Sequence, residues 1–231
     1  PEEPFFVPAE VADATAAVKA RGAKAHDAWK ATFATWSKEH PAERKALDAA
    51  LAGTLPDLST LASFPPDAKG MASRAASGKV LSALMDAVPE LVGGSADLAG
   101  SNKTPITTDF RASEEGVPRT VHWGIREHGM GSAMNGMALH GGVIPFGATF
   151  LVFADYMRPA LRLAALMELR TRYVFTHDSI GLGEDGPTHQ PVETLASLRA
   201  IPGFTVLPPC DANETREAWI AAMQCDGPSP L

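Results

Sequence analysis

The sequence predicts an α/β fold with a doubly wound, mainly parallel sheet that carries helices on both faces, preceded by a helical segment. Two observations lead to this prediction. From residue 73 onward, short apolar runs alternate with stretches of helical periodicity, which is typical of a parallel sheet. Before residue 70, Ala, Lys and Glu are frequent and glycine is scarce. The chain has 231 residues, 45% hydrophobic and 20% charged, so it is long enough to bury a full core.

The helical segment is predicted to be separate from the rest of the chain. Apolar residues recur at helical spacing between Val18 and Trp36, and we expect two helices here. Residues 53–70 contain several glycines and prolines, which break helices, so this stretch reads as a surface connection. The predicted division is therefore a helical linker over residues 1–70 and an α/β domain over residues 71–231.

Within the α/β domain, helices and strands are predicted to alternate. The first helix covers residues 73–89, where Val80, Leu84 and Val88 share one apolar face and Pro89 ends the helix. Further helices are expected over residues 126–141, 151–170 and 212–225, the last entered through Asp211 or Asn213 as N-cap. Strands are expected within residues 90–95, 120–125, 141–150, 172–180 and 203–211.

Polar clusters follow several of these strands, at the edge of the sheet where α/β proteins bind ligands. Taken alone, Glu127 reads as a carboxylate at a helix N-terminus, stabilised by the helix dipole. Three glycines follow it within residues 129–136, and they indicate close approach of a ligand or of another backbone. For Phe150, Phe153 and Tyr156, the spacing by itself favours packing in the core.

The loop after the fourth predicted strand combines His177, Asp185 and His189. Closing a loop requires only Ser, Asn and Gly, so this combination favours a functional role. The same loop contains GLGEDG, which has the spacing of a dinucleotide-binding turn. Pro187 and Pro191 prevent the helix that such a turn requires, so binding of NAD is disfavoured.

Composition argues against several classes of protein. The formal net charge is -7 and the basic residues form no stripe, so nucleic acid is not an expected partner. The sequence has no apolar stretch of membrane-spanning length, and its acidic, proline-rich start does not resemble a secretory signal. Cys210 and Cys225 are the only cysteines, which excludes a disulfide framework. We therefore expect a cytoplasmic protein that makes no membrane contact.

Four segments together resemble the pyrimidine-binding (Pyr) domain of the transketolase family, with its preceding helical linker. These segments are GGSADLAGSN, HWGIREHGM, GATFLVFADYMRPALRLAALM and THDSIGLGEDGPTHQPVE. The resemblance implies the thiamine-diphosphate-binding fold and transfer of a two-carbon ketol unit between sugar phosphates in the pentose phosphate pathway. It covers essentially the whole chain. His128 and Gly100 stand where relatives often have Phe and Pro.

The resemblance also implies site roles. Glu127 would be catalytic by bonding the aminopyrimidine of thiamine diphosphate, and Phe153, with Phe150 and Tyr156, would pack around that ring. A carboxyl group in an apolar pocket is suited to share a proton with a ring nitrogen.

The substrate-binding residues implied by the resemblance lie elsewhere in the chain. Arg74, Ser101 and His177 would bind the sugar phosphate. Asp185 and His189 would contact substrate hydroxyls near the reacting carbon, with His189 also catalytic.

The family's GDG motif, which binds diphosphate and Mg²⁺, is absent from the sequence, so no metal site is expected in this chain. We therefore expect an incomplete part of the enzyme, inactive alone, that forms its site as a homodimer or with complementary transketolase domains. Two alternatives remain open. One is a related thiamine-dependent enzyme, dihydroxyacetone synthase or deoxyxylulose-phosphate synthase. The other is a non-catalytic dimerisation or assembly module of the same fold.

Overall fold

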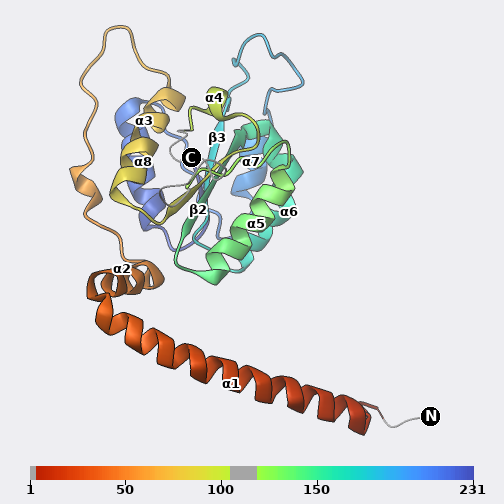
Figure 1. Ribbon diagram of the computed structural model, residues 1–231. Helices are drawn as coiled ribbons and strands as arrows, with labels where there is room; N and C mark the ends of the chain where they lie inside the picture. Colours follow the sequence, from red (N-terminus) through yellow and green to blue (C-terminus); the bar gives the residue numbers. More distant parts are fainter. Residues whose placement is uncertain (1–3, 105–118) are drawn as a thin grey trace. The chain divides into compact units, whose positions relative to one another are not determined.

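The computed structural model describes residues 4–104 and 119–231 (Figure 1). Those residues form two compact units, Pro1–Asp48 and Ala49–Leu231, which we describe separately. Among the described helices, none is long and apolar enough to cross a membrane.

The first unit contains helix α1 (Ala9–Glu39) and most of α2 (Pro41–Ala52), the two helices predicted for this segment. Not one residue of α1 is buried. Aromatic rings stack along one face of α1, with centroids 5.0 Å apart between Trp29 and Phe33 and 5.6 Å apart between Phe33 and Trp36. The rings thus contact one another without being buried.

The second unit is built on a four-stranded parallel sheet in the order β1-β2-β3-β4. Its strands are β1 (Leu91–Ser95), β2 (Ile144–Phe150), β3 (Arg172–Thr176) and β4 (Ser229–Pro230). The register pairs Ser95 with Ala148 and Phe150 with Thr176, so the carboxyl ends of β1, β2 and β3 meet at one edge. The predicted parallel sheet is confirmed.

Helices cover both faces of this sheet, as predicted. Figure 1 shows α3 and α8 on one face and α5, α6 and α7 on the other. The helices are α3 (Ser73–Ala87), α4 (Ala99–Asn102), α5 (Glu127–His140), α6 (Ala154–Leu166), α7 (Thr194–Arg199) and α8 (Ala212–Gln224). Two short 3₁₀ helices are also present, η1 (Leu58–Thr60) and η2 (Leu151–Phe153).

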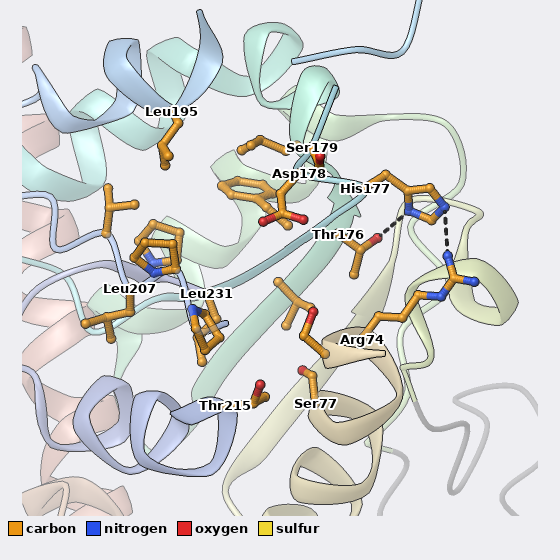
Figure 2. Close-up of a pocket in the computed structure, with 18 of the residues that line it drawn as sticks. Arg74, Ser77, Thr176, His177, Asp178, Ser179, Leu195, Leu207, Thr215 and Leu231 are labelled. Atoms are coloured by element: carbon orange, nitrogen blue, oxygen red, sulfur yellow. Dashed lines mark hydrogen bonds between the residues drawn. The ribbon is translucent and has the colours of Figure 1, made fainter. Parts of the chain in front are cut away.

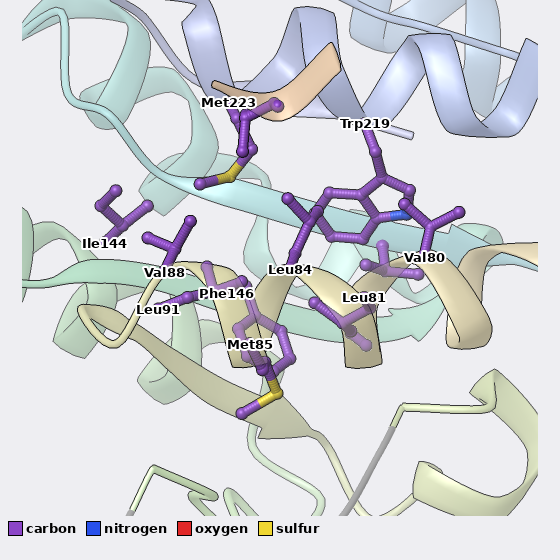
Figure 3. Close-up of a cluster of buried hydrophobic side chains, with 13 residues drawn as sticks. Val80, Leu81, Leu84, Met85, Val88, Leu91, Ile144, Phe146, Trp219 and Met223 are labelled. Atoms are coloured by element: carbon purple, nitrogen blue, oxygen red, sulfur yellow. The ribbon is translucent and has the colours of Figure 1, made fainter. Parts of the chain in front are cut away.

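A separate apolar core lies on each face of the sheet. The first, shown in Figure 3, packs α3 and α8 against Phe146 of β2, and its Trp219 is fully buried. The Trp219 indole donates a hydrogen bond to Ser77 Oγ at 2.9 Å, so its one polar group is satisfied. The second core packs methionines of α5 and α6 against Tyr173 and Phe175 of β3.

Two local features explain how the helices are placed. Asp211 is the N-cap of α8 and accepts a hydrogen bond from the Glu214 backbone at 2.8 Å, which resolves the choice between Asp211 and Asn213. Gly147 of β2 allows α5 to approach the sheet, because a Cβ there would lie 2.9 Å from the Met130 sulfur. A side chain at this position would require the Met130 and Met134 side chains of α5 to shift.

Three sequence expectations need correction. Residues 120–125 form no strand but a single parallel bridge between Thr120 and Gly93, because the described hydrogen bonds of this stretch to β1 involve Gly93 alone. Residues 203–211 are likewise not a strand, although Leu207 donates to the Pro230 carbonyl. The connection over residues 53–70 is not entirely on the surface, since Leu58 is buried against the first core.

Candidate active site

Glu127 begins helix α5 and is 8% exposed. Among the residues that the structure describes, its carboxylate has one hydrogen-bond donor, Thr149 Oγ1, at 3.5 Å. Thr149 lies near the end of β2 and is fully buried, so this contact places the start of α5 against the carboxyl edge of the sheet. A buried carboxylate with one long hydrogen bond retains acceptor capacity for a ligand.

An aromatic cluster continues from Thr149 along the chain. The Phe150 and Phe153 rings are stacked with centroids 5.7 Å apart, and Phe153 and Tyr156 are tilted at 6.0 Å. His189 approaches Phe153 edge-on at 5.3 Å. Phe150 is covered by the His177 ring at 3.7 Å and is only 6% exposed, whereas Tyr156 is 68% exposed. Phe153 and Tyr156 are therefore the members of the cluster that can meet a ligand.

Arg74 and His177 are brought together although 103 positions separate them. Arg74 lies on the first turn of α3, and His177 directly follows β3. The Arg74 Nη1 to His177 Nε2 distance is 3.2 Å, and Figure 2 shows the two side chains pointing toward one another. Burial, and after it the guanidinium of Arg74, lower the pKa of His177. The imidazole is therefore neutral at neutral pH.

The backbone of His177 is in the left-handed region, with φ of 55°. This conformation is uncommon for a residue with a side chain, and where it occurs the surroundings must hold it. Thr176 Oγ1 lies 2.9 Å from His177 Nδ1, and the Phe150 ring stacks on the imidazole. The ring is thus fixed from more than one side.

The remaining predicted substrate-binding residues lie around this pair. Asp185 and His189 belong to the loop after β3, and both affect the pKa of His177, which Asp185 raises and His189 lowers. Ser101 is exposed on α4, next to Asn102, which accepts a hydrogen bond from Thr176. The structure therefore places Asp185, His189 and His177 together at the carboxyl edge of the sheet. Glu127 lies at the same edge, where it contacts Thr149 of β2.

A cavity of about 230 Å³ adjoins this edge and includes Arg74 and His177 in its wall (Figure 2). Neither Glu127 nor Phe153 lines it, and most of its lining is apolar, contributed by α7, β3 and residues 206–209. The cavity is thus distinct from the surface beside the buried carboxylate.

One group of possible metal ligands occurs among the described residues, formed by Cys210, Asp211 and Glu214, whose ligand atoms lie within 4.8 Å of one another. All three are exposed. Their proximity is explained by capping of α8, because Asp211 accepts from the Glu214 backbone and Glu214 accepts from the Cys210 backbone. This group needs no metal to account for it.

Sequence reasoning missed the partners of the site residues. Thr149, Thr176 and Asn102 each hydrogen-bond within the site and are at most 7% exposed. The sequence does indicate two of them, because Thr149 and Thr176 each lie at the carboxyl end of an apolar run that is predicted to be a strand.

Comparison with known proteins identifies the family of this chain. The family model described as transketolase, pyrimidine binding domain, matches residues 69–231, and that described as transketolase, thiamine diphosphate binding domain, matches residues 1–56. A transketolase of Mycobacterium tuberculosis is 51% identical over 95% of this chain, which covers 33% of that protein. The chain thus spans about a third of the length of such relatives.

Solved structures agree. Transketolase from Leishmania mexicana matches 100% of this chain with a TM-score of 0.89 and 39% identity, the match covering 35% of that chain. A structure described as split gene transketolase, inactive beta4 tetramer, matches 70% of this chain and 50% of its own, with a TM-score of 0.56 and 34% identity. The matched family model covers well over half of the residues. The chain therefore belongs to the transketolase family.

Proposed function

We propose that this chain forms the part of a transketolase active site that binds the pyrimidine end of thiamine diphosphate and the sugar phosphate. The overall reaction would transfer a two-carbon ketol unit from a ketose phosphate to an aldose phosphate. The observation that supports this most directly is the Glu127 carboxylate, 8% exposed with a single 3.5 Å hydrogen bond among the described residues. Such a group is available to a ligand that offers a ring nitrogen.

The residues present fit the cofactor. An aminopyrimidine requires a proton-sharing partner at its ring nitrogen and an apolar surface for its faces, and Glu127, Phe153 and Tyr156 offer these. When bound, thiamine diphosphate supplies the carbon nucleophile of the reaction. Glu127 would hold and exchange a proton at the pyrimidine nitrogen, while the aromatic rings orient the cofactor and exclude water.

The opposite side of the site suits an anion. Arg74 offers a planar fork of donors, which binds a phosphate in two places, and Ser101 adds an exposed hydroxyl. Asp185 and His189 would contact the sugar hydroxyls, and His189 packs edge-on against Phe153, between the two ends of the site. We propose His189 as the group that carries protons at the reacting carbon.

The parts of the enzyme that this chain does not cover would complete the site. We propose that they bind the diphosphate and Mg²⁺, that the working assembly is a homodimer, and that the enzyme serves the pentose phosphate pathway in the cytoplasm. A relative described as an inactive beta4 tetramer of a split-gene transketolase supports the expectation that the isolated chain lacks activity.

A chimera tests this proposal. The matching third of the Mycobacterium tuberculosis transketolase is replaced by this chain, and ketol transfer from xylulose 5-phosphate to ribose 5-phosphate is assayed with thiamine diphosphate and Mg²⁺. We expect activity that Glu127→Gln reduces by about 10²- to 10⁴-fold. Glu193→Gln, at an exposed carboxylate before α7, is the control and should leave activity unchanged.

Other outcomes would identify the alternatives. A folded chimera that binds thiamine diphosphate but transfers no ketol unit would favour a related thiamine-dependent enzyme, tested next with formaldehyde and pyruvate as substrates. A folded chimera that binds no thiamine diphosphate would favour an assembly module. Equal activity of the parent and Glu127→Gln chimeras would refute the role of Glu127.

A further inference from the structure

A line of hydrogen bonds runs inward from the predicted phosphate-binding pair. Thr176 Oγ1 lies 2.9 Å from His177 Nδ1 and 2.6 Å from Asn102 Oδ1. Asn102 Nδ2 donates to Ser95 Oγ at 2.8 Å, and Ser95 Oγ lies 3.2 Å from Thr104 Oγ1. Asn102 is 1% exposed and the three hydroxyl residues are each at most 7% exposed. The bonds among these four residues are therefore shielded from water, while the bond to His177 is partly buried.

The outer end of the line indicates where the proton of His177 resides. A guanidinium has five N–H donors and no acceptor, so in the contact between Arg74 and His177 the imidazole Nε2 must accept. A neutral imidazole with a lone pair on Nε2 carries its hydrogen on Nδ1. Nδ1 must then donate, and its neighbour is Thr176 Oγ1.

The inner end is consistent with the same assignment. Thr176 has one hydroxyl hydrogen, which it donates to Asn102 Oδ1, and the 2.6 Å distance suits an O–H···O bond. Its oxygen is then left to accept from His177 Nδ1–H. The opposite orientation of the Asn102 amide would free the hydroxyl hydrogen for Nδ1, and would contradict the contact between Arg74 and Nε2.

We propose that Asn102 and Thr176 are positioning residues that hold His177 as its Nδ1–H tautomer and leave Nε2 as the position where a proton is taken up beside an anionic ligand. The identity of that ligand as a sugar phosphate rests on the proposed function. Neither positioning residue needs to touch the ligand.

The tautomer of His177 affects how an anion can bind. A neutral Nε2 has no hydrogen to donate to an unprotonated anion, so His177 can bond such an anion only after taking up a proton. Among the residues that the structure describes, the titratable groups that act electrostatically on the imidazole are Arg74 from α3 and Asp178, Asp185 and His189 from the loop after β3. An anion that draws Arg74 away from Nε2 removes one of the causes that lower the pKa of His177.

The tautomer can be read directly in the ligand-free chain. The protein is labelled with ¹⁵N, and the ring nitrogen resonances of His177 are identified by their loss in His177→Gln. We expect Nδ1 in the range of a protonated ring nitrogen and Nε2 in the range of an unprotonated one. An Nε2–H tautomer, or an equal mixture, in the parent chain would overturn the proposal without recourse to any variant.

Variants then test the two positioning residues. Thr176→Val keeps the shape of the side chain and removes the acceptor, so both ring nitrogen resonances should shift toward intermediate values. Asn102→Ala should do the same by freeing the Thr176 hydroxyl, whereas Thr176→Ser should retain the parent tautomer. Thr171→Val replaces a fully buried threonine that precedes β3 and lies outside the line, and should change neither resonance. Parent-like resonances in folded Thr176→Val would refute its positioning role.

Titration with sulfate, which stays unprotonated over the range used, separates this inference from the proposed function. Calorimetry in two buffers of different ionisation enthalpy should show uptake of roughly one proton per sulfate bound by the parent chain near neutral pH. Binding without proton uptake would overturn the proton-uptake part of the proposal. A chain with the expected tautomer that binds no sulfate would count against the phosphate site and leave the tautomer assignment intact.

Discussion

The two ends of the parallel sheet treat charged side chains in opposite ways. At the amino end, Arg172 begins β3 and is fully buried. Its guanidinium donates to the backbone carbonyls of Gly227 and Cys225, each at 2.7 Å, and to Ser229 Oγ at 3.1 Å. Burial first, and the charge of Arg170 second, lower the pKa of Arg172 to about 10, so it remains charged at neutral pH.

At the carboxyl end, one buried carboxylate keeps unused hydrogen-bonding capacity and one imidazole is uncharged. The Glu127 carboxylate has one described donor at 3.5 Å, and the His177 imidazole is held neutral beside Arg74. Burial alone therefore does not mark a functional charge. Arg172 donates hydrogen bonds to its own chain and so holds the fold together, although its Nε has no partner among the described residues. The Glu127 carboxylate, by contrast, has a single long bond and is available to a ligand.

The largest expected effect lies at the amino end. Arg172→Met should lower the free energy of unfolding by about 3–5 kcal/mol, because the carbonyls that line the buried guanidinium would lose their donors. Urea unfolding followed by circular dichroism measures it. Arg162→Met, at an exposed position of α6, is the matched control and should change stability by less than about 0.5 kcal/mol. Equal losses in the two variants would remove the contrast between the ends.

A smaller effect is expected for the anion end of the site. Arg74→Ala should weaken binding of ribose 5-phosphate by the chimera by about tenfold to a hundredfold, since a charge-assisted hydrogen bond contributes about 1.5–3 kcal/mol. Calorimetry gives the dissociation constant. Arg199→Ala, an exposed arginine in the last turn of α7, should bind as the parent does. An unchanged affinity in Arg74→Ala would show that the phosphate is bound elsewhere.

Glu127 should respond to substitution in the opposite direction to Arg172. Glu127→Gln should raise the free energy of unfolding by about 1 kcal/mol, because the amide keeps the shape of the side chain and relieves the burial of a poorly bonded charge. Urea midpoints of the isolated chain measure this change. A loss of stability would mean that the Glu127 carboxylate is stabilised by its contacts within the fold.

The smallest expected effect is a dependence of stability on pH. The pKa of folded His177 lies below its ordinary value of about 6.5, so the unfolded chain takes up a proton first as the pH falls. Above about pH 6.5, the contribution of His177 to the free energy of unfolding is therefore constant. As the pH falls from about 6.5 toward the folded pKa, this contribution lowers the stability of the chain. Comparing the parent with His177→Gln at about pH 8 and about pH 5 isolates this residue. If the parent and His177→Gln differed in stability by the same amount at both pH values, the lowered pKa of His177 would be contradicted.

Much of the fold could be predicted from the sequence because the core strands and helices have clear apolar patterns. The pattern of Val80 and Leu84 in α3 is buried in the structure as expected. β4 could not be predicted, since Ser229 and Pro230 have no apolar pattern and are placed by backbone bonds to the start of β3. Apolar periodicity was also not sufficient for burial, because Trp29 in α1 has it and is 56% exposed.

The candidate site was less accessible to sequence reasoning. The residue types at 177, 185 and 189 indicated a functional loop on their own chemistry. The pairing of Arg74 with His177 depends on how α3 packs beside β3, which no local spacing encodes. Asn102 and Thr176 are common residue types whose importance comes from burial and from hydrogen-bond direction, and both properties exist only in the folded chain.

The left-handed backbone of His177 restricts how this site can be redesigned. Glycine, and to a lesser extent Asn and Asp, tolerate a φ of 55°, whereas β-branched side chains do not. A library that randomises this position to change substrate preference should thus return few Val, Ile or Thr clones, for reasons unrelated to substrate. Diversity is better introduced at Ser101, an exposed neighbour on α4 whose side chain can be exchanged without straining the main chain.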